Sequence, residues 1–197
     1  MDASEAASQI LSGGVKFIQY RNKSGTRRAV YEAALRLCRL VHGVGGLFIL
    51  NDHADIALAV DADGVHLGQD DLPIEYARKL LGGGMIIGIS THSKDQAMKA
   101  EAEGADYIGL GPIFSTTSKE AGRPLGPGII TDVRRTVAIP VVAIGGITAR
   151  TILDVIGAGA DGVAVISALL SSDDMRSAAS RLVSIAAEGG ALYGGGA

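Results

Sequence analysis

The chain has no tryptophan, one cysteine and no long apolar run, and these scarcities exclude several classes of protein. Because Cys38 is the only cysteine, no disulfide can form within the chain. A helical pattern surrounds Cys38, which predicts a packed rather than a reactive thiol. No apolar run approaches the roughly 20 residues that a membrane-spanning helix needs. The net charge of −3 disfavours binding to nucleic acid or to an anionic membrane surface.

The N-terminal segment MDASEAASQ lacks the basic and apolar regions of a signal peptide, so a reducing cytoplasm is the expected location. With 197 residues, of which 47% are hydrophobic, the chain is long enough for one domain with a sizeable core. Self-association into a homo-oligomer is left open by the sequence.

Strict alternation of strand and helix patterns predicts an α/β fold. Seven continuously apolar runs indicate strands, at residues 15–20, 47–50, 64–67, 86–89, 107–110, 141–144 and 162–166. Helical patterns follow them, at about residues 26–41, 54–60, 74–81, 94–103, 128–137, 149–157 and 173–187. Continuously apolar strands are typical of a parallel sheet that is covered by helices.

Internal repeats favour a barrel. GADYIGLG begins at Gly104, GADGVAVI begins at Gly159, and DADGVHLG at Asp61 is a near copy. Each repeat lies between a helix and a strand, and such similarity is typical of a (β/α)8 TIM barrel. No linker divides the chain, so we expect one TIM-barrel domain over residues 1–188 and a flexible Gly-rich tail over 189–197.

Polar groups gather at the predicted C-terminal rim, by which we mean the edge where the carboxyl ends of the strands meet. Chemistry in such barrels belongs at that edge. The rim groups are Gln19, Arg21, Lys23, Asn51, Asp52, Gln69, Asp71, Ser90, Thr91, His92, residues 115–119, Gly145, Gly146 and Ser167. Cations, carboxylates, hydroxyls and glycines on one edge suit a phosphorylated substrate together with a metal ion.

Asp52 and Asp71 have two interpretations. Both are expected just past the ends of neighbouring strands, beside Asn51, and such an oxygen-ligand set suits Mg²⁺. Alternatively, each aspartate caps the helix that follows it. The spacing alone leaves both open. His66 lacks metal-ligand spacing and is predicted to be a core histidine with satisfied hydrogen bonds.

The other rim groups favour anion binding. Gln19, Arg21 and Lys23 alternate along the chain and share a face, which favours one shared anion over a solvated loop edge. The predicted loop that follows the strand at 107–110 and runs to residue 126 is longer than a usual strand-to-helix connection. This length favours a functional loop over an ordinary polar one. Gly145-Gly146 precede a helix start and are suited to present backbone N–H groups to a phosphate.

A set of short motifs, in this order, resembles the thiamine-phosphate synthase family. The motifs are QYRNK (19–23), ND (51–52), DGVHLGQDD (63–71), GISTHS (88–93), DYIGLGPIFSTTSK (106–119), PLG (124–126), IGGI (144–147) and ISA (166–168). Their joint order and spacing are specific, and they cover nearly the whole chain. The resemblance implies a transferase that joins 4-amino-2-methyl-5-hydroxymethylpyrimidine diphosphate to 4-methyl-5-(2-phosphoethyl)thiazole and releases thiamine phosphate and pyrophosphate.

The resemblance also implies a role for each matching residue. The pyrimidine-diphosphate site matches Gln19, Tyr20, Arg21, Asn22, Lys23, Asn51, Ser90 and Lys119, and the catalytic cations among these are Arg21, Lys23 and Lys119. The thiazole-phosphate site matches Thr116, Thr117, Ser118, Gly146, Ile166 and Ser167. Ser118 stands where the family commonly has Thr, and the hydroxyl is kept. Asp52 and Asp71 match the two Mg²⁺ ligands.

Two alternatives to the synthase are weighed. A thiazole tautomerase, an isomerase on the same barrel, would need neither the cations nor the carboxylate pair that this chain has. A non-catalytic phosphate-binding barrel is favoured only by the N-terminus. The family normally has a strand before its first helix, whereas here residues 4–11 already form that helical pattern. We therefore expect either a barrel with a gap between the strands at 15–20 and 162–166, or a natural chain with an upstream strand.

Overall fold

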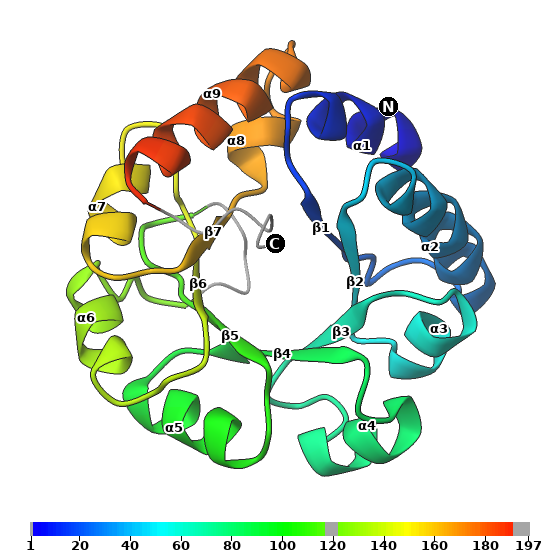
Figure 1. The fold of residues 1–197 in the computed structure, drawn as a ribbon, viewed down its shortest axis with the longest axis horizontal. Coiled ribbons are helices and arrows are strands. Elements are labelled where there is room, and N and C mark those ends of the chain that lie inside the picture. The colour runs from blue at the N-terminus through cyan, green and yellow to red at the C-terminus, as the bar shows by residue number, and fades with distance from the viewer. Residues whose placement is uncertain (1, 117–121, 191–197) are drawn as a thin grey trace.

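The computed structural model describes residues 2–116 and 122–190, which form a curved, seven-stranded parallel sheet surrounded by helices (Figure 1). The strands are β1 (Phe17–Tyr20), β2 (Leu47–Asn51), β3 (Gly64–Leu67), β4 (Ile86–Thr91), β5 (Tyr107–Leu110), β6 (Val141–Ile144) and β7 (Gly162–Ala164). The helices are α1 (Ala3–Ser12), α2 (Arg27–His42), α3 (Ala54–Ala59), α4 (Ile74–Leu81), α5 (Lys94–Ala102), α6 (Gly128–Arg134), α7 (Ile152–Gly157), α8 (Ser167–Leu170) and α9 (Met175–Glu188).

Strand order follows chain order, and every neighbouring pair is parallel. The predicted α/β alternation is therefore confirmed. β3 and β5 are buried along their whole length, which explains their uninterrupted apolar runs. Short α8 was not predicted, because four residues are too few to show a helical period. Its presence ends β7 two residues earlier than the pattern indicated.

Three aspartates make the same contact at the N-terminal side of the sheet. Asp63, Asp106 and Asp161 lie just before β3, β5 and β7, in the three sequence repeats. Each carboxylate accepts a backbone N–H near the start of the preceding strand, from Phe48 (2.7 Å), Ile87 (2.7 Å) and Val141 (2.8 Å) respectively. Each also pairs with a basic side chain from the helix before that strand, namely His42, Arg78 and Arg134. We call these contacts the aspartate clamps.

The prediction of a packed thiol at Cys38 is confirmed. Cys38 is buried, and its thiol donates to the carbonyl oxygen of Asp61 at 3.5 Å. Burial, and then the nearby negative charge of Asp63, raise the pKa of Cys38, so the thiol stays protonated. Among the helices of residues 2–116 and 122–190, none is long and apolar enough to cross a membrane.

The sheet is open, as expected from the count of strands. Over the described residues, β1 and β7 are its two edges and do not pair with each other. The helical layer continues across this opening, because α1 packs against both α2 and α9 (Figure 1). The α1–α9 contact is close at Gly13, where an added Cβ would lie 2.5 Å from the Cβ of Ala179 and 2.6 Å from a backbone oxygen of Arg176. Helix packing therefore joins the two ends of the open sheet.

The α1–α9 contact gives a stability prediction. Gly13→Ala forces the two helices apart, and such overpacking typically costs about 1–3 kcal/mol of unfolding free energy. Gly84→Ala is the matched control, since no atom lies within 4 Å of its added Cβ. Urea unfolding of both variants measures the difference. Equal unfolding free energies for the two would show that the open sheet does not depend on this helix contact.

Candidate active site

A row of hydrogen bonds links the ends of β1 and β2 at the C-terminal rim. Gln19 donates from Nε2 to Oδ1 of Asn51 at 2.8 Å. Asn51 is buried, and its amide nitrogen donates in turn to the carboxylate of Asp52. Gln19, Asn51 and Asp52, all assigned by resemblance, therefore form a continuous row of hydrogen bonds. The row fixes the orientation of the Asn51 amide and holds Asp52 at the rim.

The loop after β1 is shaped by two residues that were assigned to substrate binding. Asn22 accepts the backbone N–H groups of Ser24 (3.2 Å) and Gly25 (2.9 Å), and its amide donates to the hydroxyl of Tyr20 (3.2 Å). Such side-chain-to-backbone bonds define a turn. The structure thus gives Tyr20 and Asn22 a role in holding the loop that carries Arg21 and Lys23. Both cations are exposed.

Asp52 and Asp71 face each other from the ends of β2 and β3. Asp52 has a φ of 68°, a left-handed conformation that Asp and Asn adopt more readily than most residues. Asp71 is held by the N–H of Gly68, which its carboxylate accepts at 2.7 Å. Burial, and then the facing Asp71 carboxyl, raise the pKa of Asp52, while Asn51 and the charge of Arg21 act in the opposite direction. A carboxylate pair of this kind favours a cation between its members.

The capping interpretation of the two aspartates is wrong. The N-cap positions of α3 and α4 are occupied by His53 and Pro73, and neither position has a side-chain cap. The Asp71 carboxylate is instead used within its own turn. Over the residues that the structure describes, no group of three or more His, Cys, Asp or Glu could hold a metal ion. The pair therefore offers a partial coordination shell.

A buried histidine links β3 to the rim residue Ser90. His66 contacts the hydroxyl of Tyr107 through Nδ1 (2.8 Å) and the hydroxyl of Ser90 through Nε2 (2.9 Å). The prediction of a satisfied core histidine is confirmed. Tyr107 was not identified from the sequence, because an aromatic residue inside an apolar run gives no sign of a polar contact. Ser90 is further held through its carbonyl oxygen, which accepts from the Gln69 amide at 2.6 Å.

The loops after β5 and β6 lie against each other. The N–H of Phe114 donates to the carbonyl of Gly145 at 3.0 Å. Gly146 has a φ of 65°, and an added Cβ would lie 2.4 Å from the carbonyl oxygen of Ser115. Glycine is required there by both conformation and space. Thr116 directly follows Ser115 in the chain, so it lies next to the segment that contacts Gly146.

The remaining assigned residues are placed unevenly. Ile166 and Ser167 are exposed at the start of α8, after the last strand. Thr117, Ser118 and Lys119 lie outside the described residues, as does most of the proposed tail. The structure therefore brings the assigned residues at the ends of β1 to β4 together. Separately, it places the loop after β5 against the loop after β6.

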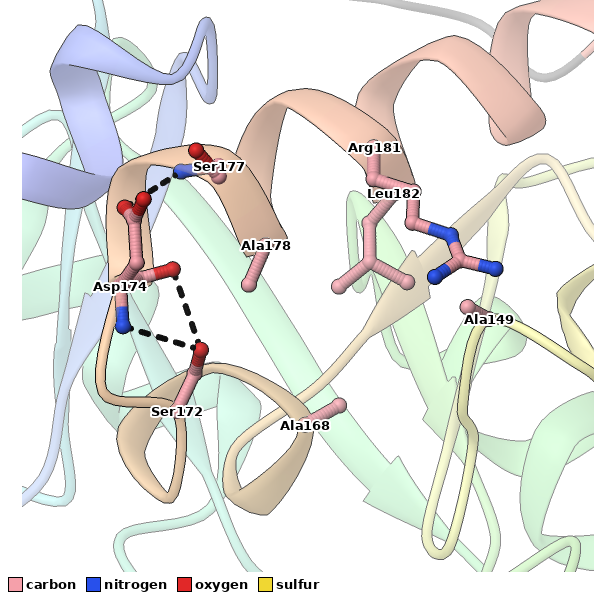
Figure 2. Close-up of a pocket in the computed structure, with 8 residues that line it drawn as sticks. All are labelled: Ala149, Ala168, Ser172, Asp174, Ser177, Ala178, Arg181 and Leu182. Atoms are coloured by element: carbon pink, nitrogen blue, oxygen red, sulfur yellow. Dashed lines mark hydrogen bonds between the residues drawn. The ribbon is translucent and has the colours of Figure 1, made fainter.

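A pocket of about 370 Å³ lies beside the loop that carries Gly146 and the start of α8. Its lining residues are Ala149, Ala168, Ser172, Asp174, Ser177, Ala178, Arg181 and Leu182 (Figure 2). Figure 2 shows Arg181 extending from α9 toward Ala149, and Asp174 accepting the N–H of Ser177. None of the residues assigned from the sequence lines this pocket, so it borders the candidate site without forming it.

Comparison with known proteins gives consistent matches. A family model described as thiamine monophosphate synthase matches residues 1–169. The thiamine-phosphate synthase of Shouchella clausii is 48% identical over 183 residues, which cover 92% of this chain and 88% of that protein. That of Chlorobium luteolum is 51% identical over 176 residues, covering 89% and 83%. The solved structure of thiamine phosphate pyrophosphorylase from Pyrococcus furiosus has a TM-score of 0.90 at 40% identity, covering 95% of this chain and 91% of that one.

The facing carboxylates predict an unusual effect on stability. A raised pKa in the folded state means that Asp52, once ionised, destabilises the fold. Asp52→Asn removes this penalty and tolerates the left-handed backbone, so its melting temperature at pH 7 should equal or exceed that of the parent chain. The advantage should shrink as the pH falls toward the unfolded-state pKa of about 3.9 and vanish below about pH 3, where aspartate is protonated in both states.

Asp52→Ala is the matched control for that measurement. It also removes the charge but places alanine in the left-handed conformation, which costs roughly 1–2 kcal/mol. The Asn variant should therefore be the more stable of the two by thermal unfolding. An Asn variant that melts well below the parent chain at pH 7 would show that Asp52 is a structural residue.

Proposed function

Because the chain belongs to the thiamine monophosphate synthase family, we propose that it joins 4-amino-2-methyl-5-hydroxymethylpyrimidine diphosphate to 4-methyl-5-(2-phosphoethyl)thiazole, yielding thiamine phosphate and pyrophosphate. The observation that carries the proposal is the rim of β1 to β4. It places a cationic loop, a hydrogen-bonded Gln19–Asn51 row and the facing Asp52 and Asp71 on one edge. The tautomerase alternative is not favoured, because the similar proteins are named as synthases.

The reaction needs charge more than proton transfer. The bond between the pyrimidine's methylene carbon and the diphosphate oxygen breaks, and pyrophosphate leaves with both electrons. The electron-rich aminopyrimidine stabilises the resulting cation, and the thiazole nitrogen then forms the new bond to that carbon. This nitrogen carries no proton, so the step needs no general base. Arg21, Lys23 and Lys119 are proposed to neutralise the leaving pyrophosphate as preorganised charges.

The carboxylate pair fits a magnesium ion. Asp52 and Asp71 would hold the ion from two strands, and hard oxygen ligands are what Mg²⁺ prefers. Two carboxylates leave most of the shell to other oxygens, so we expect binding chiefly when diphosphate is present. When bound, the ion supplies positive charge at the leaving group.

The second substrate is proposed to bind at the other side of the rim. Its phosphate would contact Thr116, Thr117, Ser118, Gly146, Ile166 and Ser167. Holding the thiazole by its phosphate places its nitrogen next to the reacting carbon. Proximity of this kind can supply up to about 7–11 kcal/mol of the barrier.

Three finer expectations stay predictions. One further parallel strand between β1 and β7 would complete a (β/α)8 barrel. A cytoplasmic location and assembly into a homo-oligomer are the other two. None of them alters the assignment of rim residues.

A turnover assay tests the proposed function. The chain should convert both substrates, in the presence of Mg²⁺, into equal amounts of thiamine phosphate and pyrophosphate, and chelation of the metal should stop the reaction. Isomerisation of a thiazole phosphate without the pyrimidine would instead establish the tautomerase. Binding of phosphate esters with no turnover would establish a non-catalytic barrel.

The two sides of the rim should respond differently to mutation. Lys119→Ala removes a charge that meets the departing pyrophosphate, and loss of one such group typically lowers kcat by about 10²–10³-fold. Ser167→Ala should act mainly by raising KM for the thiazole phosphate. Steady-state kinetics with each substrate varied in turn separates the two effects. An unchanged kcat for Lys119→Ala at saturation would remove this lysine from the catalytic role.

A further inference from the structure

A hydrogen-bonded chain runs through the sheet interior and ends at the rim. Tyr107 on β5 contacts His66 on β3 at 2.8 Å, and His66 contacts Ser90 on β4 at 2.9 Å. His66 and Tyr107 each have 7% of their surface exposed. Their rings also lie together, with centroids 5.4 Å apart. Of the three residues, Ser90 is the least buried, so it is the end at which a ligand can meet the chain.

The surrounding strands leave space for this pair. A Cβ on Gly88 would lie 2.1 Å from the Tyr107 ring. A Cβ on Gly109 would lie 3.1 Å from Cε1 of His66. Neither glycine has a left-handed backbone. Glycine is therefore needed at both positions because the two rings occupy the space that a side chain would take. The interior is built around the Tyr107–His66 pair.

The hydrogen-bond partners of Tyr107 and His66 determine which of the two groups donates. Burial raises the pKa of Tyr107, so its hydroxyl keeps its proton. Within residues 2–116 and 122–190, the only acceptor in contact with that hydroxyl is Nδ1 of His66. The reverse arrangement would leave a buried donor unsatisfied, which costs more free energy than an ordinary hydrogen bond contributes. Tyr107 therefore donates to Nδ1.

The ring then determines how Ser90 is used. Because Nδ1 accepts the Tyr107 proton, it carries no proton of its own, and the ring is neutral with one N–H. With Nδ1 accepting, that N–H is on Nε2 and donates to the Ser90 hydroxyl oxygen. The proton of Ser90 must then point away from His66. Ser90 is left as a donor toward whatever occupies the rim.

We propose that Tyr107 and His66 are positioning residues that fix the Ser90 hydroxyl as a hydrogen-bond donor to an acceptor atom of the pyrimidine substrate. This inference rests on the proposed function, which assigns Ser90 to the pyrimidine-diphosphate site. The ring nitrogens and the diphosphate oxygens of that substrate are hydrogen-bond acceptors, which a fixed O–H donor recognises and a fixed acceptor would repel. Gln69 assists by holding the Ser90 carbonyl at 2.6 Å.

A double-mutant cycle with kinetics tests the proposal. Tyr107→Phe keeps the ring but removes the donor to Nδ1, which frees His66 to take the other tautomer. The kcat/KM for the pyrimidine diphosphate should fall roughly three- to tenfold, the size of one hydrogen bond, with KM for the thiazole phosphate unchanged. In a Ser90→Ala background, Tyr107→Phe should have almost no further effect.

Thr131→Val is the matched control, because the Thr131 hydroxyl on α6 is not among the rim groups and donates to the carbonyl of Ala158 at 2.9 Å. It loses a partly buried hydrogen bond without touching the chain to Ser90, so it should leave kcat/KM for the pyrimidine diphosphate near the parent value. Nitrogen NMR of His66 gives a second readout. The parent chain should show the proton on Nε2, and Tyr107→Phe should shift it toward Nδ1.

The outcomes separate this inference from the proposed function. Parent turnover, with equal effects of Tyr107→Phe in the parent chain and in the Ser90→Ala variant, would overturn the inference and leave the function intact. A proton on Nδ1 in the parent chain would do the same. A parent chain that does not make thiamine phosphate would overturn the function and this use of Ser90 together.

Discussion

The sheet depends on a contact made three times at its N-terminal side, where a carboxylate accepts the backbone N–H of the preceding strand. Asp63, Asp106 and Asp161 join β2 to β3, β4 to β5 and β6 to β7. The backbone N–H of each aspartate also donates to a carbonyl of that strand, at 3.0, 2.8 and 2.9 Å. Each clamp therefore fixes two strands in register and ties a helix to them through a basic side chain.

The strand register that the clamps fix at the N-terminal side of the sheet determines which residues lie next to each other at the C-terminal rim. Because Asn51 pairs with His66 and Ser90 pairs with Gly109, residues far apart in the chain reach the rim together. The same register puts His66 opposite Gly88, which leaves room for the Tyr107 ring. At the open edge between β1 and β7, helices α1 and α9 provide the closing contact.

The strands and the rim could be predicted from the sequence because both follow local rules. Continuous apolar runs indicated the strands, and polar residues directly after them indicated the site. The Tyr107–His66 contact could not be predicted, since it joins residues 41 positions apart through the interior. Helix α8 could not be predicted either, because its four residues are too few to show a helical period. The capping alternative for Asp71 failed for a local reason, because its carboxylate accepts the N–H of Gly68, three residues earlier in the same turn.

Measuring the unfolding free energy of Asp106→Ala tests the role of the clamps most directly. The change leaves the Ile87 N–H without its carboxylate and Arg78 without its ion pair. We expect a loss of about 1–3 kcal/mol, together with faster amide exchange at the start of β4. Asp132→Ala, at an exposed position of α6, is the control and should change the free energy by less than about 0.5 kcal/mol. Equal free energies for both variants would contradict the account.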